Sequence, residues 1–327
     1  MSKTNKKLSR VMAVSLAALA ISGSALAVNQ PLGAPSQGAL GAGQFADKRP
    51  VINEDSIAFG AYDPHGDFSD DANVSIEHLF LPWEDVDLST LALADEYALE
   101  RERSLMITVE PWSWSVDWRV TPDELLAGIL AGSYDANIEA VCAATAEVKS
   151  PVTMRWGQEM DETDGQFSWA QWTPEGFIAA YRRFVTECRK QLPDATYMWS
   201  PKGNPTLVDF YPGDDFVDVV GLSVFGYQEF DLGFFGKQRT FADALEQGYR
   251  LVEGYGKPIF VAELGYEGDR GYVRDWARSV AKSHPAFPEL TSVVYFNDRE
   301  VYPWPQNYGR PNWRVGGQST ASDQSNR

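Results

Sequence analysis

Eight short stretches rich in β-branched and aromatic residues recur along this chain, and long helical patterns separate several of them. Such alternation of strand and helix is typical of a parallel sheet and argues against a sandwich. The chain has no obvious internal repeat and no second zone of composition. The sequence therefore predicts the α/β class and a single (β/α)8 TIM barrel over residues 50–315, since such barrels commonly take about 250 residues. The expected strands are residues 57–62, 76–83, 104–112, 151–158, 195–201, 217–227, 258–265 and 290–298.

Several boundaries of the expected helices carry recognisable signals. Thr121 is followed by a proline and, three positions on, by Glu124, which is the pattern of a capping box. Thr173 is likewise followed by a proline, ahead of an apolar stripe at helical spacing. Gly254 and Gly256 are expected to end the helix that precedes the seventh strand.

The two ends of the chain differ from the barrel in composition. Residues 1–27 combine four cationic side chains, an apolar run over 11–21 and small residues up to Ala27, which predicts a secretory signal peptide cleaved after Ala27. The apolar run is too short to span a bilayer, which argues against the alternative of a retained membrane anchor. We expect a flexible linker over 28–49 and a disordered tail over 316–327. The mature protein should then be exported, to the periplasm or outside the cell, with no stable membrane insertion.

The chain is strongly acidic, with a net charge of −18. Cleavage of the signal peptide would remove four positive and no negative charges, which gives −18 − 4 = −22 for the mature chain. A field of this sign repels nucleic acids and anionic polymers, although solubility alone explains it equally well. We expect no nucleic-acid partner and a monomeric protein.

Two cysteines, Cys142 and Cys188, lie in consecutive expected helices. Helices that follow one another are neighbours around a barrel, and export would place both thiols in an oxidising compartment, so a disulfide is feasible. Two buried free thiols are the alternative. The spacing matches no zinc motif.

Two glutamates stand at the carboxyl ends of expected strands. Glu159 follows the fourth strand and Glu263 lies at the end of the seventh. In a TIM barrel the active site lies at this end, and a pair of carboxyl groups facing each other there suits a retaining glycosidase. Trp156 and Met160 beside Glu159 would desolvate it and favour the general-acid role, with Glu263 as nucleophile. From the residues alone the two roles can also be reversed.

Three segments resemble glycoside hydrolase family 26. Residues 154–161 (MRWGQEMD) are similar to the fourth-strand motif of that family, and residues 260–265 (FVAELG) to its seventh-strand motif. Residues 211–221 resemble its entry to strand six. The resemblance covers most of residues 50–315 and implies a (β/α)8 barrel acting on β-mannan, mixed-linkage β-glucan or β-1,3-xylan. It also implies Glu159 as acid/base, retention of configuration and a mechanism without metal or cofactor.

The chain departs from the family pattern at two positions. Gln158 stands where mannanases of the family usually have His just before the acid/base, and an amide cannot titrate. Phe225 stands where strand six usually presents a Tyr to the nucleophile. Tyr227 has the same strand parity, so it is the candidate to supply that hydroxyl.

Other residues are candidates for a substrate groove. Flat indole rings stack on the apolar faces of sugars, although Trp is also common in the layer between helices and barrel. Arg155 shares the parity of Glu159 and could orient the catalytic groups or form a structural ion pair, and His65 is either a sugar ligand or a solvated loop residue. The tryptophans that follow expected strands are Trp83, Trp112, Trp114, Trp118 and Trp304.

Competing chemistries find little support in the sequence. Asp67, Asp70 and Asp71 lack the glycine and terminal Glu of an EF-hand, so we expect a solvated acidic loop. The chain has no H-E-x-x-H, no G-x-S-x-G and no phosphate loop. We therefore expect a retaining endo-β-glycanase whose partner is a neutral β-linked polysaccharide, of plant or bacterial origin. A non-catalytic carbohydrate-binding barrel and a transglycosylase with the same residues are the alternatives.

Overall fold

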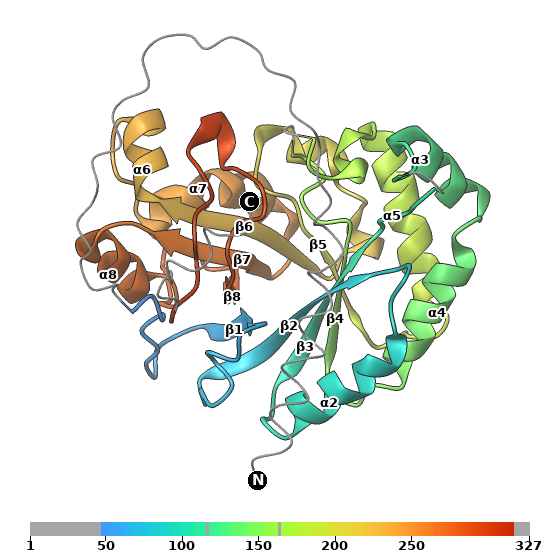
Figure 1. Ribbon diagram of the computed structural model, residues 1–327, viewed down its shortest axis with the longest axis horizontal. Helices are drawn as coiled ribbons and strands as arrows, with labels where there is room; N and C mark the ends of the chain where they lie inside the picture. Colours follow the sequence, from blue (N-terminus) through green and yellow to red (C-terminus); the bar gives the residue numbers. More distant parts are fainter. Residues whose placement is uncertain (1–46, 116–117, 163–164, 317–327) are drawn as a thin grey trace, which may run out of the picture.

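Eight parallel strands close into a barrel in chain order, with β1 paired to β8 (Figure 1). The computed structural model describes residues 47–115, 118–162 and 165–316. All eight expected strands are present, and the predicted TIM barrel is confirmed. The predicted signal peptide lies outside the described residues, as do most of the predicted linker and tail. The strands are β1 Ala58–Tyr62, β2 Val74–Pro82, β3 Ser104–Glu110, β4 Val152–Trp156, β5 Thr196–Trp199, β6 Val219–Tyr227, β7 Ile259–Glu267 and β8 Leu290–Phe296.

Helices surround the barrel. Figure 1 shows α2 to α5 on one side of the strands and α7 and α8 on the other. The predicted capping box of Thr121 opens α3, and Thr173 caps α5. Gly256, in the left-handed conformation, closes the turn before β7. The helices are α2 Leu91–Leu99, α3 Pro122–Ala131, α4 Asp135–Ala146, α5 Pro174–Arg189, α6 Gln228–Phe230, α7 Phe241–Val252 and α8 Arg270–Ser279.

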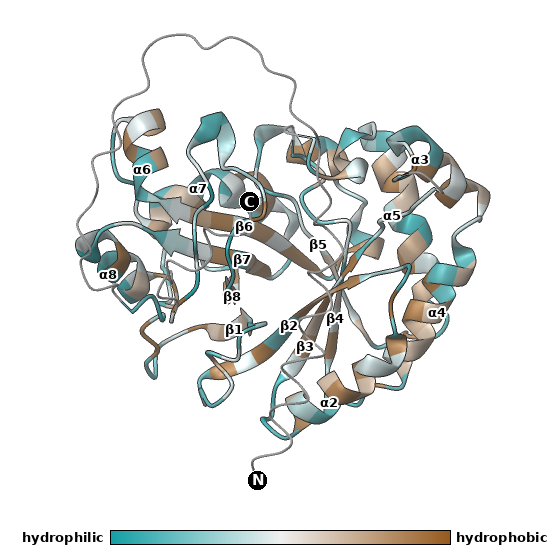
Figure 2. Ribbon diagram, viewed as in Figure 1, coloured by the Kyte–Doolittle hydropathy of each residue, from teal (hydrophilic) through white to brown (hydrophobic). Residues whose placement is uncertain are grey.

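The strands alternate between two buried environments, because successive side chains point to opposite faces. On β3, Leu105, Ile107 and Val109 belong to the large core between strands and helices, whereas Met106 belongs to a small cluster inside the barrel. Figure 2 shows hydrophobic residues along the strands and on parts of the surrounding helices. The interior cluster fills the floor of the barrel and leaves its upper part to polar residues. Its members are Ile76, Met106, Met198, Val219, Ala262 and Val294, with Phe260 packed against them.

The domain begins earlier than predicted. Lys48, placed in the expected linker, is only 6% exposed. Its carbonyl accepts a hydrogen bond from the hydroxyl of Tyr266, and the guanidinium of Arg49 donates to the carbonyl of Asp67. Residues 47–49 therefore belong to the packed domain, because their backbone and side chains close the outside of β1 and β7.

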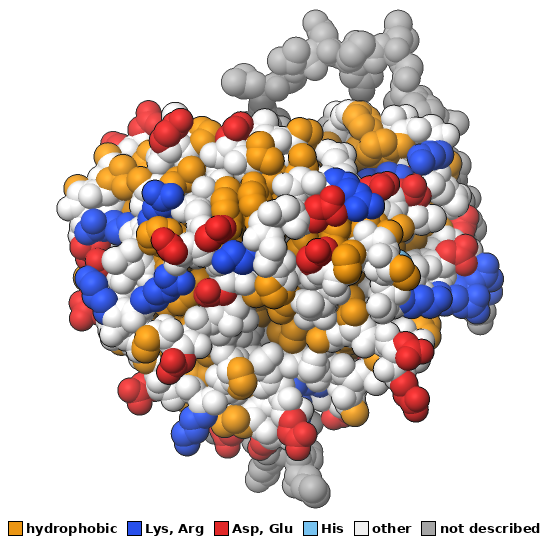
Figure 3. Space-filling view, turned by 180° about the vertical axis from the view of Figure 1, so that it is seen from behind, with side chains coloured by type: hydrophobic (Ala, Val, Ile, Leu, Met, Phe, Trp, Pro, Cys, Tyr) orange, Lys and Arg blue, Asp and Glu red, His pale blue; other side chains and the backbone are white. Residues whose placement is uncertain are grey.

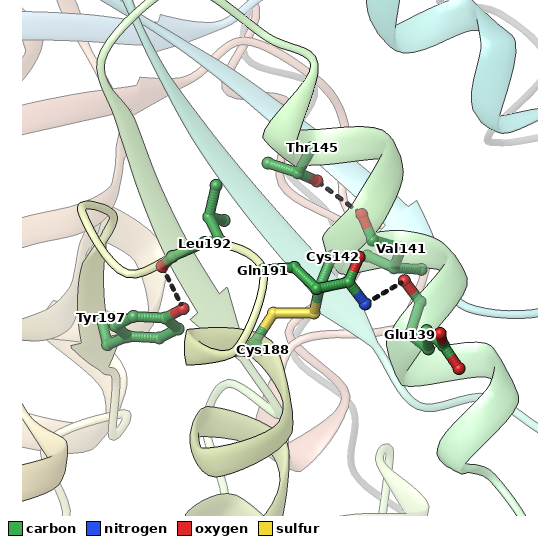
Figure 4. Close-up of a disulfide and its surroundings, with 8 residues drawn as sticks. All are labelled: Glu139, Val141, Cys142, Thr145, Cys188, Gln191, Leu192 and Tyr197. Carbon is green, nitrogen blue, oxygen red and sulfur yellow. Dashed lines mark hydrogen bonds between the residues drawn. A yellow bond between two sulfur atoms is a disulfide. The ribbon is translucent and has the colours of Figure 1, made fainter.

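A disulfide joins α4 to α5. Cys142 and Cys188 are bonded, with Cα atoms 5.3 Å apart, and both are buried (Figure 4). Close by, Gln191 donates to the carbonyl of Glu139, which also links the two helices. The bond therefore crosslinks consecutive helices around the barrel.

The surface carries charges of both signs. Figure 3 shows acidic and basic side chains interspersed over one face of the molecule, with apolar side chains exposed in groups between them. Within the described residues, no helix is long and apolar enough to cross a membrane.

Candidate active site

Arg155 and Glu263 form an ion pair inside the upper barrel. The guanidinium Nη1 lies 2.7 Å from Oε1 of Glu263, and the Arg155 side chain is fully buried. Arg155 also donates to the hydroxyls of Ser200, at 2.8 Å, and Thr108, at 3.2 Å. The sequence left two roles open for Arg155, orienting the catalytic groups or forming an ion pair. The structure shows an ion pair, and its partner is the predicted nucleophile, so one contact can serve both roles.

Thr108 connects Arg155 to a further buried side chain. Nε2 of His78 on β2 lies 2.8 Å from the Thr108 hydroxyl. Burial lowers the pKa of His78 well below its usual value, and the nearby charge of Arg155 lowers it further. His78 is therefore neutral and helps to hold Thr108, and through it Arg155, in place.

Glu159 sits on a constrained turn after β4. Its φ of 54° lies in the left-handed region, which a non-glycine residue rarely adopts, and Gly157 two residues earlier has φ 57°. The Glu159 amide donates to the carbonyl of Ser200 at 2.8 Å. Uncommon backbone conformations of this kind concentrate at functional sites, where the surrounding structure maintains them. The turn places Glu159 at the carboxyl end of the barrel, only 9% exposed.

The environment of Glu263 favours its protonated form. The pKa of Glu263 is raised to about 7: burial is the main cause, Arg155 opposes it, and the negative charges of Glu159 and Glu300 contribute to the rise. A carboxyl group with such a pKa changes charge near neutral pH. The influence of Glu159 on this pKa also means that the two predicted catalytic carboxyl groups lie within electrostatic reach of each other.

Sequence reasoning missed a carboxyl group at the end of β3. Glu110 accepts a 2.7 Å hydrogen bond from Nε2 of Gln158. Burial raises the pKa of Glu110, and the hydrogen bonds from Gln158 and Trp112 oppose that shift. Gln158, 2% exposed, thus holds a neighbouring carboxyl group, and its carbonyl accepts from the indole of Trp169. Glu110 was overlooked because the expected third strand ran past it.

A second missed carboxyl group follows β8. Oε1 of Glu300 accepts a 2.8 Å hydrogen bond from the indole of Trp313. The pKa of Glu300 is raised to about 7: burial is the main cause, the hydrogen bond from Trp313 opposes it, and the charge of Glu159 contributes to the rise while that of Lys202 lowers it. Lys202, in the loop after β5, also forms an ion pair with Glu162. Glu300 therefore belongs to the same group of acidic side chains as the predicted catalytic pair.

Two of the predicted sugar platforms are wrong. Trp83 is 3% exposed; its indole donates to the Trp112 carbonyl, and its ring stacks on Tyr134. Trp112 is 7% exposed, with Arg119 over its ring at 3.8 Å and Trp169 packed at 4.7 Å. Trp83 is thus covered by Tyr134, just before α4, and Trp112 by side chains of the loops after β3 and β4.

The other tryptophans keep accessible surface. Trp118 is 57% exposed and packs edge to face on Trp114, with ring centroids 5.7 Å apart. Trp304, after β8, is partly exposed and contacts Phe225 on β6. These three remain candidates for stacking on sugar rings.

Aromatic residues other than Trp also line the mouth. Tyr62 on β1 packs against Phe80 on β2 and Phe296 on β8, with centroids 4.9 and 5.1 Å apart. Burial raises the pKa of Tyr62, and nearby negative charges, among them that of Glu263, contribute to the rise, so the phenol lies within electrostatic reach of the predicted nucleophile. These residues occupy strand positions that point into the barrel, so the alternation of side chains along the strands predicts them. They were missed because only tryptophans were considered as sugar platforms.

Tyr227 does not supply the expected hydroxyl to Glu263. Its hydroxyl donates to the carbonyl of Tyr308 at 2.8 Å and lies 3.1 Å from Glu229. Tyr227 does share the strand face of Phe225, as predicted, but its hydroxyl binds the Tyr308 carbonyl in the loop after β8 instead of Glu263. Phe225, on the same face, packs against Trp313.

His65 and the acidic loop have structural partners. Nε2 of His65 lies 3.0 Å from Asp298, just after β8, and the His65 side chain is 31% exposed. Asp67 accepts hydrogen bonds from Asn297 and Arg314. Nowhere in the described ranges do three or more His, Cys, Asp or Glu side chains gather as metal ligands would.

Comparisons with known proteins agree with this site. The profile of Glycosyl hydrolase family 26 matches residues 134–245, which contain Glu159. A β-1,3-xylanase from Alcaligenes sp. is 25% identical over 178 residues, covering 51% of this chain and 35% of that protein. A second β-1,3-xylanase, from Vibrio sp., is 26% identical over 139 residues, covering 40% and 27%. The chain thus spans about a third or less of the length of these curated relatives.

Solved structures show the same fold. GH26C from Muricauda sp. has a TM-score of 0.58 at 16% identity, covering 82% of this chain and 84% of that one. A GH26 β-mannanase from Bacteroides ovatus has a TM-score of 0.54 at 17% identity, covering 74% and 81%. A closed (β/α)8 barrel with one carboxyl group just after β4 and another on β7 is an arrangement that retaining glycosidases use. The family whose model matches this third of the chain is the one that the motifs predict.

Proposed function

We propose that the protein is a retaining endo-β-glycanase that hydrolyses a neutral β-linked polysaccharide through a glycosyl-enzyme intermediate. The observation that carries this proposal is the buried ion pair of Arg155 with Glu263, beside Glu159 on its constrained turn. Arg155 opposes the rise in pKa that burial causes, so that Glu263 can still ionise near neutral pH, as a nucleophile requires.

The proposed reaction has two steps. Glu159 gives its proton to the glycosidic oxygen while the Glu263 carboxylate attacks the anomeric carbon, so that the glycosyl ester forms as the leaving sugar departs. Glu159, now a base, takes a proton from water, and that water attacks the anomeric carbon, so that the bond from this carbon to the Glu263 oxygen breaks and the carboxylate is freed. Two displacements at one carbon retain its configuration.

Several observations support a glycan substrate. The named relatives are β-1,3-xylanases and a β-mannanase, and partly exposed aromatic rings stand around the mouth. The negative charge of the chain suits a neutral polymer better than an anionic one. β-Mannan, mixed-linkage β-glucan, β-1,3-xylan and a bacterial exopolysaccharide are the candidates.

Export and a monomeric state complete the proposal. The cationic and apolar pattern of residues 1–27, ending in small side chains, supports secretion to the periplasm or beyond. The disulfide between Cys142 and Cys188 suits an oxidising compartment.

The test is reducing-sugar release by residues 28–327 on β-mannan, glucomannan, mixed-linkage β-glucan, β-1,3-xylan and cellulose. We expect release from one of these polymers, and a loss on the order of 10⁴-fold in Glu263→Ala, the scale on which removal of one catalytic group acts. Polymer binding without turnover on all five would support the non-catalytic alternative.

Azide can show which of the two glutamates is the nucleophile and which is the acid/base. The substrate is an aryl β-glycoside with a good leaving group, which departs without help from an acid. With Glu263→Ala, azide attacks the substrate directly and should give the α-glycosyl azide. With Glu159→Ala, azide attacks the glycosyl-enzyme and should give the β-glycosyl azide. The opposite products would reverse the assignment, and long oligosaccharide products would favour transglycosylation.

A further inference from the structure

Exposed apolar side chains follow β6. Leu232, Phe234 and Phe235 are 49%, 52% and 43% exposed. They belong to the π-helical turn Asp231–Phe235, directly after α6, which Figure 1 shows at the edge of the barrel. Phe230 stacks on Phe234, with ring centroids 5.1 Å apart and planes at 8°. We refer to residues 230–235 together with Tyr308 as the aromatic shelf.

Ring contacts connect the shelf to the mouth of the barrel without a gap. Phe225, on the interior face of β6, contacts Trp304 at 5.8 Å. Trp304 contacts Phe230 at 6.2 Å, and Phe230 contacts Tyr308 at 5.3 Å. A continuous aromatic surface thus runs from the candidate active site outward to Phe234.

The shelf is held in place by buried polar contacts beneath it. Asp231 is fully buried and accepts hydrogen bonds from Nε of Arg239, at 2.7 Å, and from the hydroxyl of Tyr272, at 2.6 Å. A Cβ at Gly233 would collide with the Tyr308 ring, so glycine allows the two loops to touch. A buried ion pair thus anchors a segment whose apolar side chains face water. Such an arrangement is costly for a surface without a ligand.

We propose that the aromatic shelf binds sugar units of the polysaccharide that lie beyond the cleaved bond. This inference rests on the proposed function. The apolar faces of pyranose rings stack on flat aromatic side chains, and rings that are rigid before binding lose little entropy when they do so. A chain bound across the catalytic carboxyl groups and leaving the mouth past Trp304 meets Phe230 and Phe234 next.

The size of the shelf favours a glycan over a second protein. A stable protein interface buries roughly 1,200 Å² or more in total, which takes about 20 residues on each side. The shelf offers three strongly exposed side chains and two partly exposed ones. Two or three sugar units need no more than that.

The test uses polymer binding by the inactive Glu263→Gln protein, measured as retardation in gels that contain glucomannan or mixed-linkage β-glucan. In this background, Phe234→Ala with Phe235→Ala should weaken retardation about fivefold or more, because each lost ring contact costs about 1 kcal/mol. The conservative variant Phe234→Tyr should bind the polymer as well as the Glu263→Gln parent does, since it keeps an aromatic ring at this position. Leu130→Ala, a variant of an equally exposed side chain on α3, is the control that should not change retardation.

Turnover provides a second readout. In the active protein, the shelf variant should lower the ratio of kcat/KM on the polymer to kcat/KM on a short aryl glycoside about fivefold. Equal retardation of parent and shelf variant would overturn the proposal, as would a change in sedimentation coefficient that assigns the shelf to self-association. Retardation by a wild-type protein that cleaves no polymer would contradict the proposed hydrolysis and leave the shelf supported.

Discussion

Nη1 of Arg155 on β4 lies 2.7 Å from Oε1 of Glu263 on β7, three strands away, in the interior of the barrel. Arg155 is fully buried, and its remaining contacts are with the hydroxyls of Ser200 and Thr108. One cation thus stands among several buried carboxyl groups. Its position beside Glu263 opposes the effect of burial on that carboxyl group, whose pKa is raised to about 7.

Replacement of Arg155 by Met should destabilise the protein by about 3–5 kcal/mol, because it leaves a buried carboxylate without its partner. The loss should be larger at pH 8 than at pH 5, since burial raises the pKa of Glu263 to about 7 and the group is neutral at pH 5. Urea unfolding at the two pH values measures the difference. Arg183→Met, which breaks a partly exposed pair with Asp135, should cost about 1 kcal/mol or less. An equal loss at both pH values for Arg155→Met would show that the ion pair is not the cause.

Activity should fall as the pH decreases through about 7, because the nucleophile must be ionised and the pKa of Glu263 is raised to about 7. The charge of Glu300 contributes to that rise, so Glu300→Gln should move the acidic limb of kcat/KM to lower pH. Glu246→Gln, at an exposed site on α7, is the control. A limb that stays in place in Glu300→Gln would mean that Glu300 does not act on the catalytic pair.

Ionisation of Glu263 and Glu300 should also affect the stability of the protein, which should fall as the pH rises, whereas activity should increase. A raised pKa in the folded state means that the neutral carboxyl group favours folding below its unfolded pKa, and this contribution is lost as the pH rises through about 7. The melting temperature of the wild type should therefore decrease between about pH 5 and pH 8. The decrease should be smaller in Glu263→Gln and in Glu300→Gln, whose amides do not ionise.

The strands, and the placement of Glu159 and Glu263 in the upper part of the barrel, were predictable from sequence because both depend on local patterns. A β-rich run between helical segments identifies a strand, and a TIM barrel places the active site at the strand ends. The fate of Trp83 and Trp112 was not predictable, because it depends on whether a loop turns toward the mouth or back onto the helices. Glu300 was missed for a related reason: it becomes a site residue only when Trp313, from the end of the domain, packs against β6 and binds it.

Tyr227 illustrates a different limit. The alternation of side chains along β6 correctly placed its ring on the same face as Phe225, and both pack against Trp313. Strand periodicity gives the direction of a side chain but not the partner of its hydroxyl. That partner, the Tyr308 carbonyl, lies 81 residues later in the chain.

Trp118→Ala should affect mainly substrate binding, whereas Trp83→Ala should affect mainly stability. Trp118 is 57% exposed, so its removal should raise the KM for the polymer several-fold with a change in stability within about 0.5 kcal/mol. Trp83 is 3% exposed, so its removal should cost about 3–5 kcal/mol through the cavity it leaves. Initial rates and urea unfolding of both variants give the comparison. An unchanged KM in Trp118→Ala would remove this tryptophan from the substrate groove.

Loss of the disulfide should lower stability without touching the site. The bond between Cys142 and Cys188 closes a loop of 46 residues, and release of that constraint in the unfolded chain should cost about 4 kcal/mol. The double variant Cys142→Ser with Cys188→Ser should match wild type treated with a thiol reductant, while the reductant should have no effect on the double variant. Urea midpoints of the four samples provide the measurement. If reduction leaves the wild-type midpoint unchanged, the two helices are held by packing alone, through contacts such as that of Gln191 with the Glu139 carbonyl.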